Sequence, residues 1–461
     1  MTAYDGRMLR RRAWALAAAT ALAGCAAILD VGDVGYGPSE GADGGDAGGI
    51  ASDATADATI IDGGPDADAG PEVDAAYGDF RDPNLWESAT LGDIGLINAD
   101  QWTCGFFDGA RVVYMPRYTS YAAVAFDITK RFDIVGSWTQ SPIPFFLDAA
   151  AQTTGCAFDG ARTYLTLSNF NAEPDYVPFR EADGGWGVID LTYLDAGTYH
   201  GRPVTGGGYL HLPSFGGSIA SPEMRVVTSG LPAPPKVTVY DSTQIRALVR
   251  DYVNAVFVGQ YLYLVPRSGA PATYAARVDT SKELNDPVAW QFFDAARITS
   301  PACDGFHSAT FDGRYVYMWG DYWNGTSNMV VVRVDTTADF QAPGSWEAVD
   351  LRTPPPDAAT SALYYAGSTF DGRYLYALAN NGASSIALAR FDTRAAFVAS
   401  SFDYAPLPAV LANGKIPADA RFVGVTFDGQ SVYLGPFDSA VARVKIKTPA
   451  ALPSTAHATF Y

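Results

Sequence analysis

The sequence predicts an all-β fold, a single β-propeller of seven four-stranded blades. The 461-residue chain contains 13% aromatic residues, 46 Gly and 29 Pro, and only 18% of its residues are charged. That balance is typical of strands joined by many turns rather than of a helical protein. A motif also repeats: FDGRYVY at 311–317 returns as FDGRYLY at 370–376 and as FDGQSVY at 427–433. Finally, a strand missing from the last repeat is found near the N-terminus.

The repeat extends over most of the chain. Earlier copies begin at Phe107 and Phe158, and degenerate copies at Thr205 and Phe257, so successive copies lie 47 to 59 residues apart. Asp-Gly between alternating apolar residues predicts a tight hairpin with both residues at positive φ. Four antiparallel strands recurring at this period are typical of a propeller blade. The repeats resemble kelch-type and related bacterial propellers in architecture.

A second motif follows the hairpin. An Asp ends the third strand of a blade, and a Trp begins the fourth strand eleven residues later; in one copy a Phe takes this place after ten. We expect these Asp side chains to bind local backbone and the Trp side chains to pack between blades. The pairs are Asp127 with Trp138, Asp279 with Trp290, Asp335 with Trp346, and Asp392 with Phe402.

Ring closure can be inferred from the two ends of the repeat region. The last copy, from Phe427 to Lys447, has three strands and no Trp strand, while DPNLW at 82–86 matches DPVAW at 286–290. We therefore predict that the N-terminal strand completes the last blade and removes two free edges. Seven blades follow if 205–242 form a blade, and six if that region is an insertion; we predict seven.

The N-terminus predicts export and lipidation. Arg10 to Arg12 precede a short Ala/Leu core, which is the pattern of a signal peptide over residues 1–24. LAGC at 22–25 resembles the bacterial lipobox, and this resemblance implies a lipid on Cys25 that anchors the protein to a membrane. Ala26 after the Cys favours the outer membrane in Gram-negative systems. We therefore expect a cell-envelope protein, facing either the periplasm or the outside.

Residues 25–77 are predicted to form a disordered tether, followed by the propeller at 78–461. Residues 26–80 hold eleven Asp and two Glu with no Lys or Arg, and therefore most of the net charge of −19. The segment has too little apolar bulk to repay the entropy of ordering. Such lipobox-plus-Asp/Gly/Ala tethers resemble those of myxobacterial surface lipoproteins. The acidic balance excludes a nucleic-acid binder driven by phosphate neutralisation.

Few residues suggest chemistry. The Asp residues of the Asp-Gly turns recur blade by blade, whereas a catalytic carboxylate pair would be unique. Cys104 and Cys156 lie in adjacent innermost strands and could form a disulfide or remain small buried thiols. Cys303 and His307 are weak candidates for metal ligation. We predict no cofactor and no catalytic residues.

The remaining candidates are loop residues on one face of the ring. Aromatic side chains with amides and a carboxylate suit contact with a protein or a glycan. We therefore expect a monomeric binding or scaffold module rather than an enzyme. The alternatives are an envelope enzyme with a glycoside- or uronate-cleaving site or a quinone in the central depression, and a structural subunit of a surface or secretion complex. The candidate contact residues are Tyr118, Tyr121, Asp321, Tyr322, Trp323, Asn324, Tyr364 and Tyr365, with Asn380 and Asn381 nearby.

Overall fold

The computed structural model of the chain describes much of the predicted propeller region. Cys25 and the predicted tether up to residue 76 lie outside the described residues, as do Tyr121, Cys303, Tyr322, Trp323 and Asn324. Within the described part, no helix has the length and apolar character needed to cross a bilayer. The described residues are 77–96, 101–118, 122–143, 152–168, 176–191, 200–213, 223–229, 231, 236–240, 242–246, 251–267, 274–298, 305–321, 329–352, 364–381, 385–412, 416, 420–437 and 439–446.

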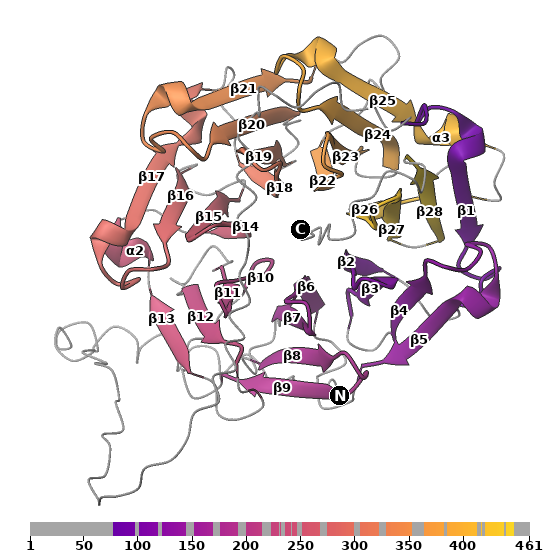
Figure 1. Cartoon of the computed structure of the whole chain (residues 1–461), viewed down its shortest axis with the longest axis horizontal. Helices are drawn as coiled ribbons and strands as arrows, with labels where there is room; N and C mark the ends of the chain where they lie inside the picture. The colour runs from indigo at the N-terminus through magenta and orange to yellow at the C-terminus, as the bar shows by residue number, and fades with distance from the viewer. Residues whose placement is uncertain are drawn as a thin grey trace, which may run out of the picture. The chain divides into compact units, whose positions relative to one another are not determined.

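Seven four-stranded antiparallel sheets surround a common centre in the described part of the chain, as Figure 1 shows. The seven-bladed propeller is thereby confirmed, and the region 205–242 is a blade. The first three blades, from the innermost strand outward, are β2 (Trp102–Phe107), β3 (Arg111–Pro116), β4 (Ala122–Asp127) and β5 (Trp138–Pro142); β6 (Gln152–Phe158), β7 (Arg162–Ser168), β8 (Tyr176–Glu181) and β9 (Trp186–Asp190); and β10 (Val204–Gly206), β11 (Tyr209–Leu212), β12 (Glu223–Val227) and β13 (Val237–Tyr240).

The other four blades follow in chain order, except that the last takes its outermost strand from the N-terminus. They are β14 (Tyr252–Val258), β15 (Tyr261–Pro266), β16 (Tyr274–Asp279) and β17 (Trp290–Asp294); β18 (Phe306–Phe311), β19 (Tyr315–Gly320), β20 (Val330–Asp335) and β21 (Trp346–Asp350); β22 (Tyr364–Phe370), β23 (Tyr374–Asn380), β24 (Ser385–Asp392) and β25 (Phe402–Pro406); and β26 (Phe422–Phe427), β27 (Ser431–Pro436), β28 (Ala440–Lys445) and β1 (Trp86–Thr90).

Short helices lie between strands. Four-residue α-helices are α2 (Ser242–Ile245) and α3 (Leu407–Val410), and 3₁₀ turns are η1 (Pro83–Leu85), η2 (Val135–Ser137), η4 (Pro287–Ala289), η5 (Ala295–Ile298), η6 (Pro343–Ser345) and η7 (Ala399–Ser401). The predicted match between 82–86 and 286–290 is confirmed: Asp82 caps η1 and Asp286 caps η4 in the same way, each ahead of an outermost strand.

The ring closes as predicted, because β1 pairs with β28 from Trp86 opposite Val444 to Thr90 opposite Ala440. Among the described residues, one apolar cluster occupies each of the seven boundaries between neighbouring blades. The innermost strands approach closely: a Cβ on Gly367 would lie 2.9 Å from the Cα of Gly424 in the next blade. Small residues are therefore required around the axis.

The Asp-Gly turns differ from the prediction in one respect. In the fifth blade, Gly313 has φ +101°, but Asp312 is not at positive φ. The main-chain N–H of Asp312 donates to the carbonyl of Tyr315 (3.2 Å), so Gly313 and Arg314 are the two central residues. The Asp312 carboxylate accepts hydrogen bonds from the main-chain N–H groups of Arg314 and Tyr315 and from the Tyr317 hydroxyl. The Asp is thus a cap on the turn, and the same pattern recurs at Asp159, Asp371 and Asp428.

The predicted roles of the second motif are confirmed. The carboxylate of Asp335 accepts from the main-chain N–H of Thr337 (2.9 Å) and from its hydroxyl. The indole of Trp346 donates to the carbonyl of Phe340 (2.7 Å) and stacks on Phe293 of the preceding blade, with ring centroids 4.4 Å apart. Trp86, Trp138 and Trp290 each donate to a carbonyl six residues earlier.

Sequence analysis missed an Arg in the third strand of several blades. Arg333 is 9% exposed; it donates to Glu347 on the adjacent outermost strand (2.9 Å) and lies over the ring of Phe397 in the next blade. Its equivalents, Arg277, Arg390 and Arg443, likewise lie over a Phe of the following blade. Each guanidinium therefore donates a charge-assisted hydrogen bond to the outermost strand of its own blade and makes a cation–π contact with the next blade.

We predict that Trp346→Phe lowers the free energy of unfolding by about 1–2 kcal/mol without preventing folding, because the carbonyl of Phe340 loses its buried donor. Phe402 fills the same position in the sixth blade, so a ring without N–H is compatible with the fold. The matched control is Trp186→Phe, where the structure shows no equivalent hydrogen bond. Urea unfolding measures both; equal losses would contradict the assigned role of the indole N–H.

Candidate functional site: the axial rim

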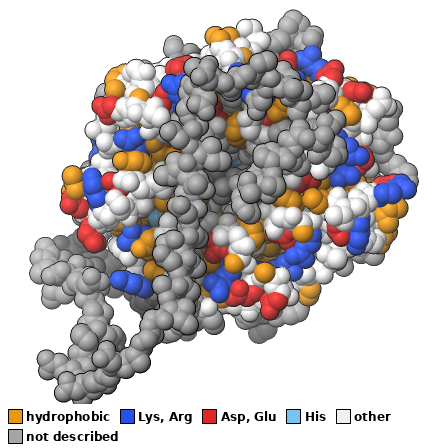
Figure 2. All heavy atoms as spheres, viewed as in Figure 1, with side chains coloured by type: hydrophobic (Ala, Val, Ile, Leu, Met, Phe, Trp, Pro, Cys, Tyr) orange, Lys and Arg blue, Asp and Glu red, His pale blue; other side chains and the backbone are white. Residues whose placement is uncertain are grey.

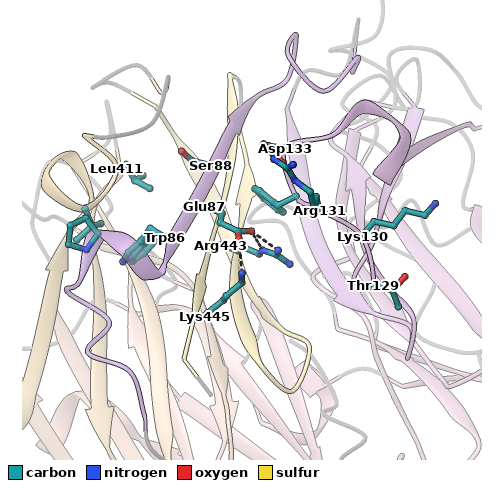
Figure 3. Close-up of a pocket in the computed structure, with 13 residues that line it drawn as sticks. Trp86, Glu87, Ser88, Thr129, Lys130, Arg131, Asp133, Leu411, Arg443 and Lys445 are labelled. Carbon is teal, nitrogen blue, oxygen red and sulfur yellow. Dashed lines mark hydrogen bonds and ion pairs between the residues drawn. The ribbon is translucent and has the colours of Figure 1, made fainter. Parts of the chain in front are cut away.

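Two grooves lie at blade boundaries. One, of about 490 Å³, opens between the last and first blades (Figure 3). There Glu87 accepts hydrogen bonds from Arg443 and Lys445, each at 2.7 Å, and Figure 3 shows the three side chains converging. Burial opposes ionisation of Glu87, but the bonds from Lys445 and the charge of Arg443 outweigh it and lower its pKa.

The second groove, of about 460 Å³, lies between the third and fourth blades and is lined at equivalent positions by Arg225 and by Thr280 to Glu283. In both grooves, one wall is the third strand of a blade. The other wall is the loop that joins the third and fourth strands of the following blade. In the first groove, Lys130 and Arg131 also pair with nearby Asp residues. These charges belong to the repeated coupling of blades, so we assign the grooves to the architecture.

Polar residues that take no part in the coupling of blades gather elsewhere. The first strand of each blade begins, and the second ends, on the side opposite the Asp-Gly turns. We call the described residues at these ends the axial rim. Main-chain hydrogen bonds fix it, for example from Arg117 to Gln101 and from Arg267 to Asp251. The rim comprises Gln101, Arg117, Tyr118, Arg202, Asp251, Arg267, His307, Asp321, Tyr364, Arg421 and Phe437.

Arg202 is the centre of one rim cluster. It precedes β10 in the third blade, and its Nη2 lies 3.5 Å from Nδ1 of His307 in the fifth blade. The His307 ring lies 6.0 Å from the ring of Tyr364 in the sixth blade. Burial lowers the pKa of Arg202 to about 10, although the charge of Asp321 acts to raise it. Three blades thus contribute to one partly buried cationic cluster.

The pKa of His307 is lowered to about 3, chiefly by burial and further by the charges of Arg202 and Arg267. His307 is therefore neutral across the physiological range. The same surroundings disfavour a metal cation at His307. In the described residues no group of three or more His, Cys, Asp or Glu side chains is placed to hold a metal ion.

A second rim cluster surrounds Phe437. Its ring centroid lies 4.1 Å from the guanidinium carbon of Arg421 and 6.0 Å from that of Arg117. Arg117 also lies over Tyr118, at 5.6 Å, and Tyr118 forms a bridge to Gln152 of the second blade. Around the periphery, by contrast, Figure 2 shows acidic and basic side chains interspersed rather than gathered by sign.

The structure therefore groups only some of the predicted contact residues. Asp321 and Tyr364 lie near Arg202, and Tyr118 lies at the second cluster. Tyr365 is a correction: it is 0% exposed and packs against Trp319, so its side chain does not face a partner. The alternation of a strand explains this, since its neighbour Tyr364 points the other way. Asn380 is also buried and donates to the carbonyl of Phe422.

The question of the two Cys residues is settled by the structure. Cys104 in β2 and Cys156 in β6 form a disulfide, with their Cα atoms 6.0 Å apart. The bond links the innermost strands of the first two blades close to the axis, directly beneath the rim.

The rim arginines were not predicted, because aromatic and amide side chains in loops are the usual signal of a contact surface. A signal was present in the sequence, because a Pro ends the second strand and an Arg follows it at both 116–117 and 266–267. No sequence pattern predicted the contact between Arg202 and His307, because that contact depends on closure of the ring.

No protein-family model matches the sequence, and no curated protein matches it significantly. Among solved structures, a chain in the crystal structure of the mitotic checkpoint complex is similar, with a TM-score of 0.51 and 8% identity over 82% of this chain and 97% of that chain. The N-terminal domain of Nup159 has a TM-score of 0.47 and 10% identity, over 79% of this chain and 96% of that chain. BamB from Moraxella catarrhalis has a TM-score of 0.40 and 12% identity, over 75% of this chain and 85% of that chain. At 8% identity, the likeness to the chain of the mitotic checkpoint complex concerns the propeller fold alone.

We predict that Arg202→Gln raises the pKa of His307, because one of the charges that disfavour protonation is removed. An unfolded His titrates near 6.5. Between that value and about 3, the unfolded chain binds a proton that folded His307 does not, so stability falls as pH falls, by about 1.4 kcal/mol per unit. In the variant, this pH range should be narrower, because the pKa of folded His307 lies closer to that of an unfolded His. Histidine-selective NMR titration measures it, and an unchanged His307 pKa would contradict the assigned contact.

Proposed function

We propose that the protein is a lipid-anchored propeller of the bacterial cell envelope that binds a partner, either a protein or a glycan, at its axial rim. The observation that carries this proposal is the cluster of Arg202, His307 and Tyr364, contributed by three different blades. In the described residues, most repeated polar side chains are engaged in turns and blade coupling. The rim cluster has no such repeated role, and its charge, imidazole and aromatic ring suit recognition.

Two features favour a protein as the partner. Arg and Tyr are enriched at the energetic centres of protein interfaces, and the rim offers both. The similar chain in the mitotic checkpoint complex comes from the structure of an assembled complex, which is a property of that protein. That this chain also assembles with a protein is part of the proposal.

The proposed location depends on LAGC at 22–25 and on the Asp/Gly/Ala-rich segment at 25–77. A lipid on Cys25 would hold the protein at a membrane, with the outer membrane favoured by Ala26, and the segment would hold the propeller away from the bilayer. The disulfide between Cys104 and Cys156 supports this location, since such bonds persist in oxidising compartments outside the cytosol.

We expect the full-length protein to capture a stoichiometric partner from envelope extract, and the double variant Asp321→Ala/Tyr364→Ala to lose it. The matched control is Lys130→Ala/Arg131→Ala, which removes side chains that are 53% and 75% exposed and lie away from the rim. Affinity capture read by mass spectrometry, with a glycan array in parallel, measures both. Capture that survives the rim variant, or that fails equally in the control, would refute the rim as the binding surface.

We expect Cys25→Ser to abolish incorporation of labelled fatty acid and to release the protein from the membrane fraction, because the acceptor thiol is lost. Metabolic labelling and fractionation of cells measure the two effects. Cys303→Ser serves as the control, since it removes a Cys outside the lipobox. Labelling that persists without Cys25 would refute the proposed anchor.

A further inference from the structure

A small cavity lies on the axis of the ring, where the innermost strands meet. It holds about 30 Å³, and residues of six blades line it, among them Thr103, Cys156, Arg202, Asn254 and Gly367. That volume suits one water molecule or one small anionic group. The cavity adjoins the axial rim through Arg202, which belongs to both.

Two of the residues that line this cavity, Asn254 and Arg202, carry strong hydrogen-bond donors. Asn254 is 2% exposed; its Oδ1 accepts a hydrogen bond from the main-chain N–H of Ala255 at 2.7 Å. This bond orients the amide and leaves Nδ2 without a partner among the described residues. An unsatisfied buried donor is costly, so a ligand with an acceptor atom would stabilise the site. No carboxylate is among the residues that line the cavity.

Arg202 supplies the positive charge. Its Cα and Cγ would each lie 2.8 Å from a Cβ on Gly155, so the side chain runs tightly across the innermost strand of the second blade. Its guanidinium then reaches His307, which is neutral and offers no compensating charge. In the described part of the chain no carboxylate forms an ion pair with Arg202. A partly buried guanidinium with no carboxylate in ion-pair contact, and with only the charge of Asp321 nearby to offset it, attracts an anion.

We propose that the axial cavity binds a carboxylate group, held by the guanidinium of Arg202 and the amide nitrogen of Asn254. A carboxylate fits because it is acceptor-only, planar and able to take two donors at once. The group can come from a free small acid or from the partner that docks on the axial rim. Only the second source rests on the proposed function, and the anion site itself does not.

The test uses the full-length protein with sodium formate as the probe of a free carboxylate. At constant ionic strength, increasing formate should raise the melting temperature along a saturating curve, since a ligand that binds only the folded state stabilises it. Arg202→Gln should weaken formate binding at least tenfold by calorimetry. The matched control, Arg131→Gln, changes an exposed Arg far from the axis and should bind like the wild type. A wild type that does not respond, or an Arg202→Gln variant that responds equally, would overturn the proposal.

A second variant guards against misfolding of Arg202→Gln. Asn254→Asp keeps the acceptor for Ala255 but places a carboxylate next to Arg202, so it should fold and lose the formate response. The His307 pKa gives an independent measure: bound formate offsets the charge of Arg202 and should raise this pKa in the wild type only. A formate response retained in Asn254→Asp would contradict the site.

Comparison with partner capture separates the two proposals. Formate binding without any rim-dependent partner would leave the anion site standing and refute the proposed function. Partner capture that persists in Asn254→Asp would show that the partner does not supply the carboxylate. If Asn254→Asp and Arg202→Gln both lose capture, and if formate competes with the partner for binding, the partner is the source of the carboxylate.

Discussion

The pairing of β1 with β28 is the constraint on which the rest of the structure depends. The Arg443 guanidinium and the Glu87 carboxylate that connect these two strands are 356 residues apart in sequence, whereas each of the other six sheets is built from four consecutive strands. Without β1, the last blade would expose an edge, and the cluster between the last two blades would lose Phe80 and Trp86. The entropy cost of closing a loop grows only slowly with its length, so apolar burial at the boundaries can offset it even here. The closing strand removes the free edges of the ring and completes the apolar clusters on both sides of the last blade.

Within the described part of the ring, most polar side chains make contacts that repeat from blade to blade. An Asp caps a turn, a second Asp ends the third strand, and an Arg of the third strand contacts a Phe of the next blade. The acidity of the repeats is therefore poor evidence for catalysis, because these carboxylates already accept hydrogen bonds from nearby backbone and hydroxyl groups. Positions that depart from the repeat are better evidence for function. Arg202 departs from it most clearly, because it lines the axial cavity and forms no ion pair with a carboxylate among the described residues.

The sequence was sufficient to predict the blades, their number and the closing strand, because each depends on local patterns. Asp-Gly turns, the Trp at a fixed spacing and the DPNLW match at 82–86 are all readable without knowing what lies nearby in space. The precise turn was not predicted: Asp312 caps it from outside the two central positions, and only side-chain hydrogen bonds reveal this. Tyr365 was misassigned because neighbouring Tyr residues on one strand face opposite ways.

The candidate site was less predictable for a geometric reason. At the circumference, blades diverge, and a side chain meets only its own blade and its immediate neighbours. At the axis the innermost strands converge, so Arg202 of the third blade reaches His307 of the fifth. Such a contact joins residues 105 positions apart and leaves no periodic trace in the sequence. Because contacts between blades that are not adjacent can form only near the axis, a ring of similar blades has few other places to build an asymmetric site. The cavity beneath the axial rim is where this chain does so.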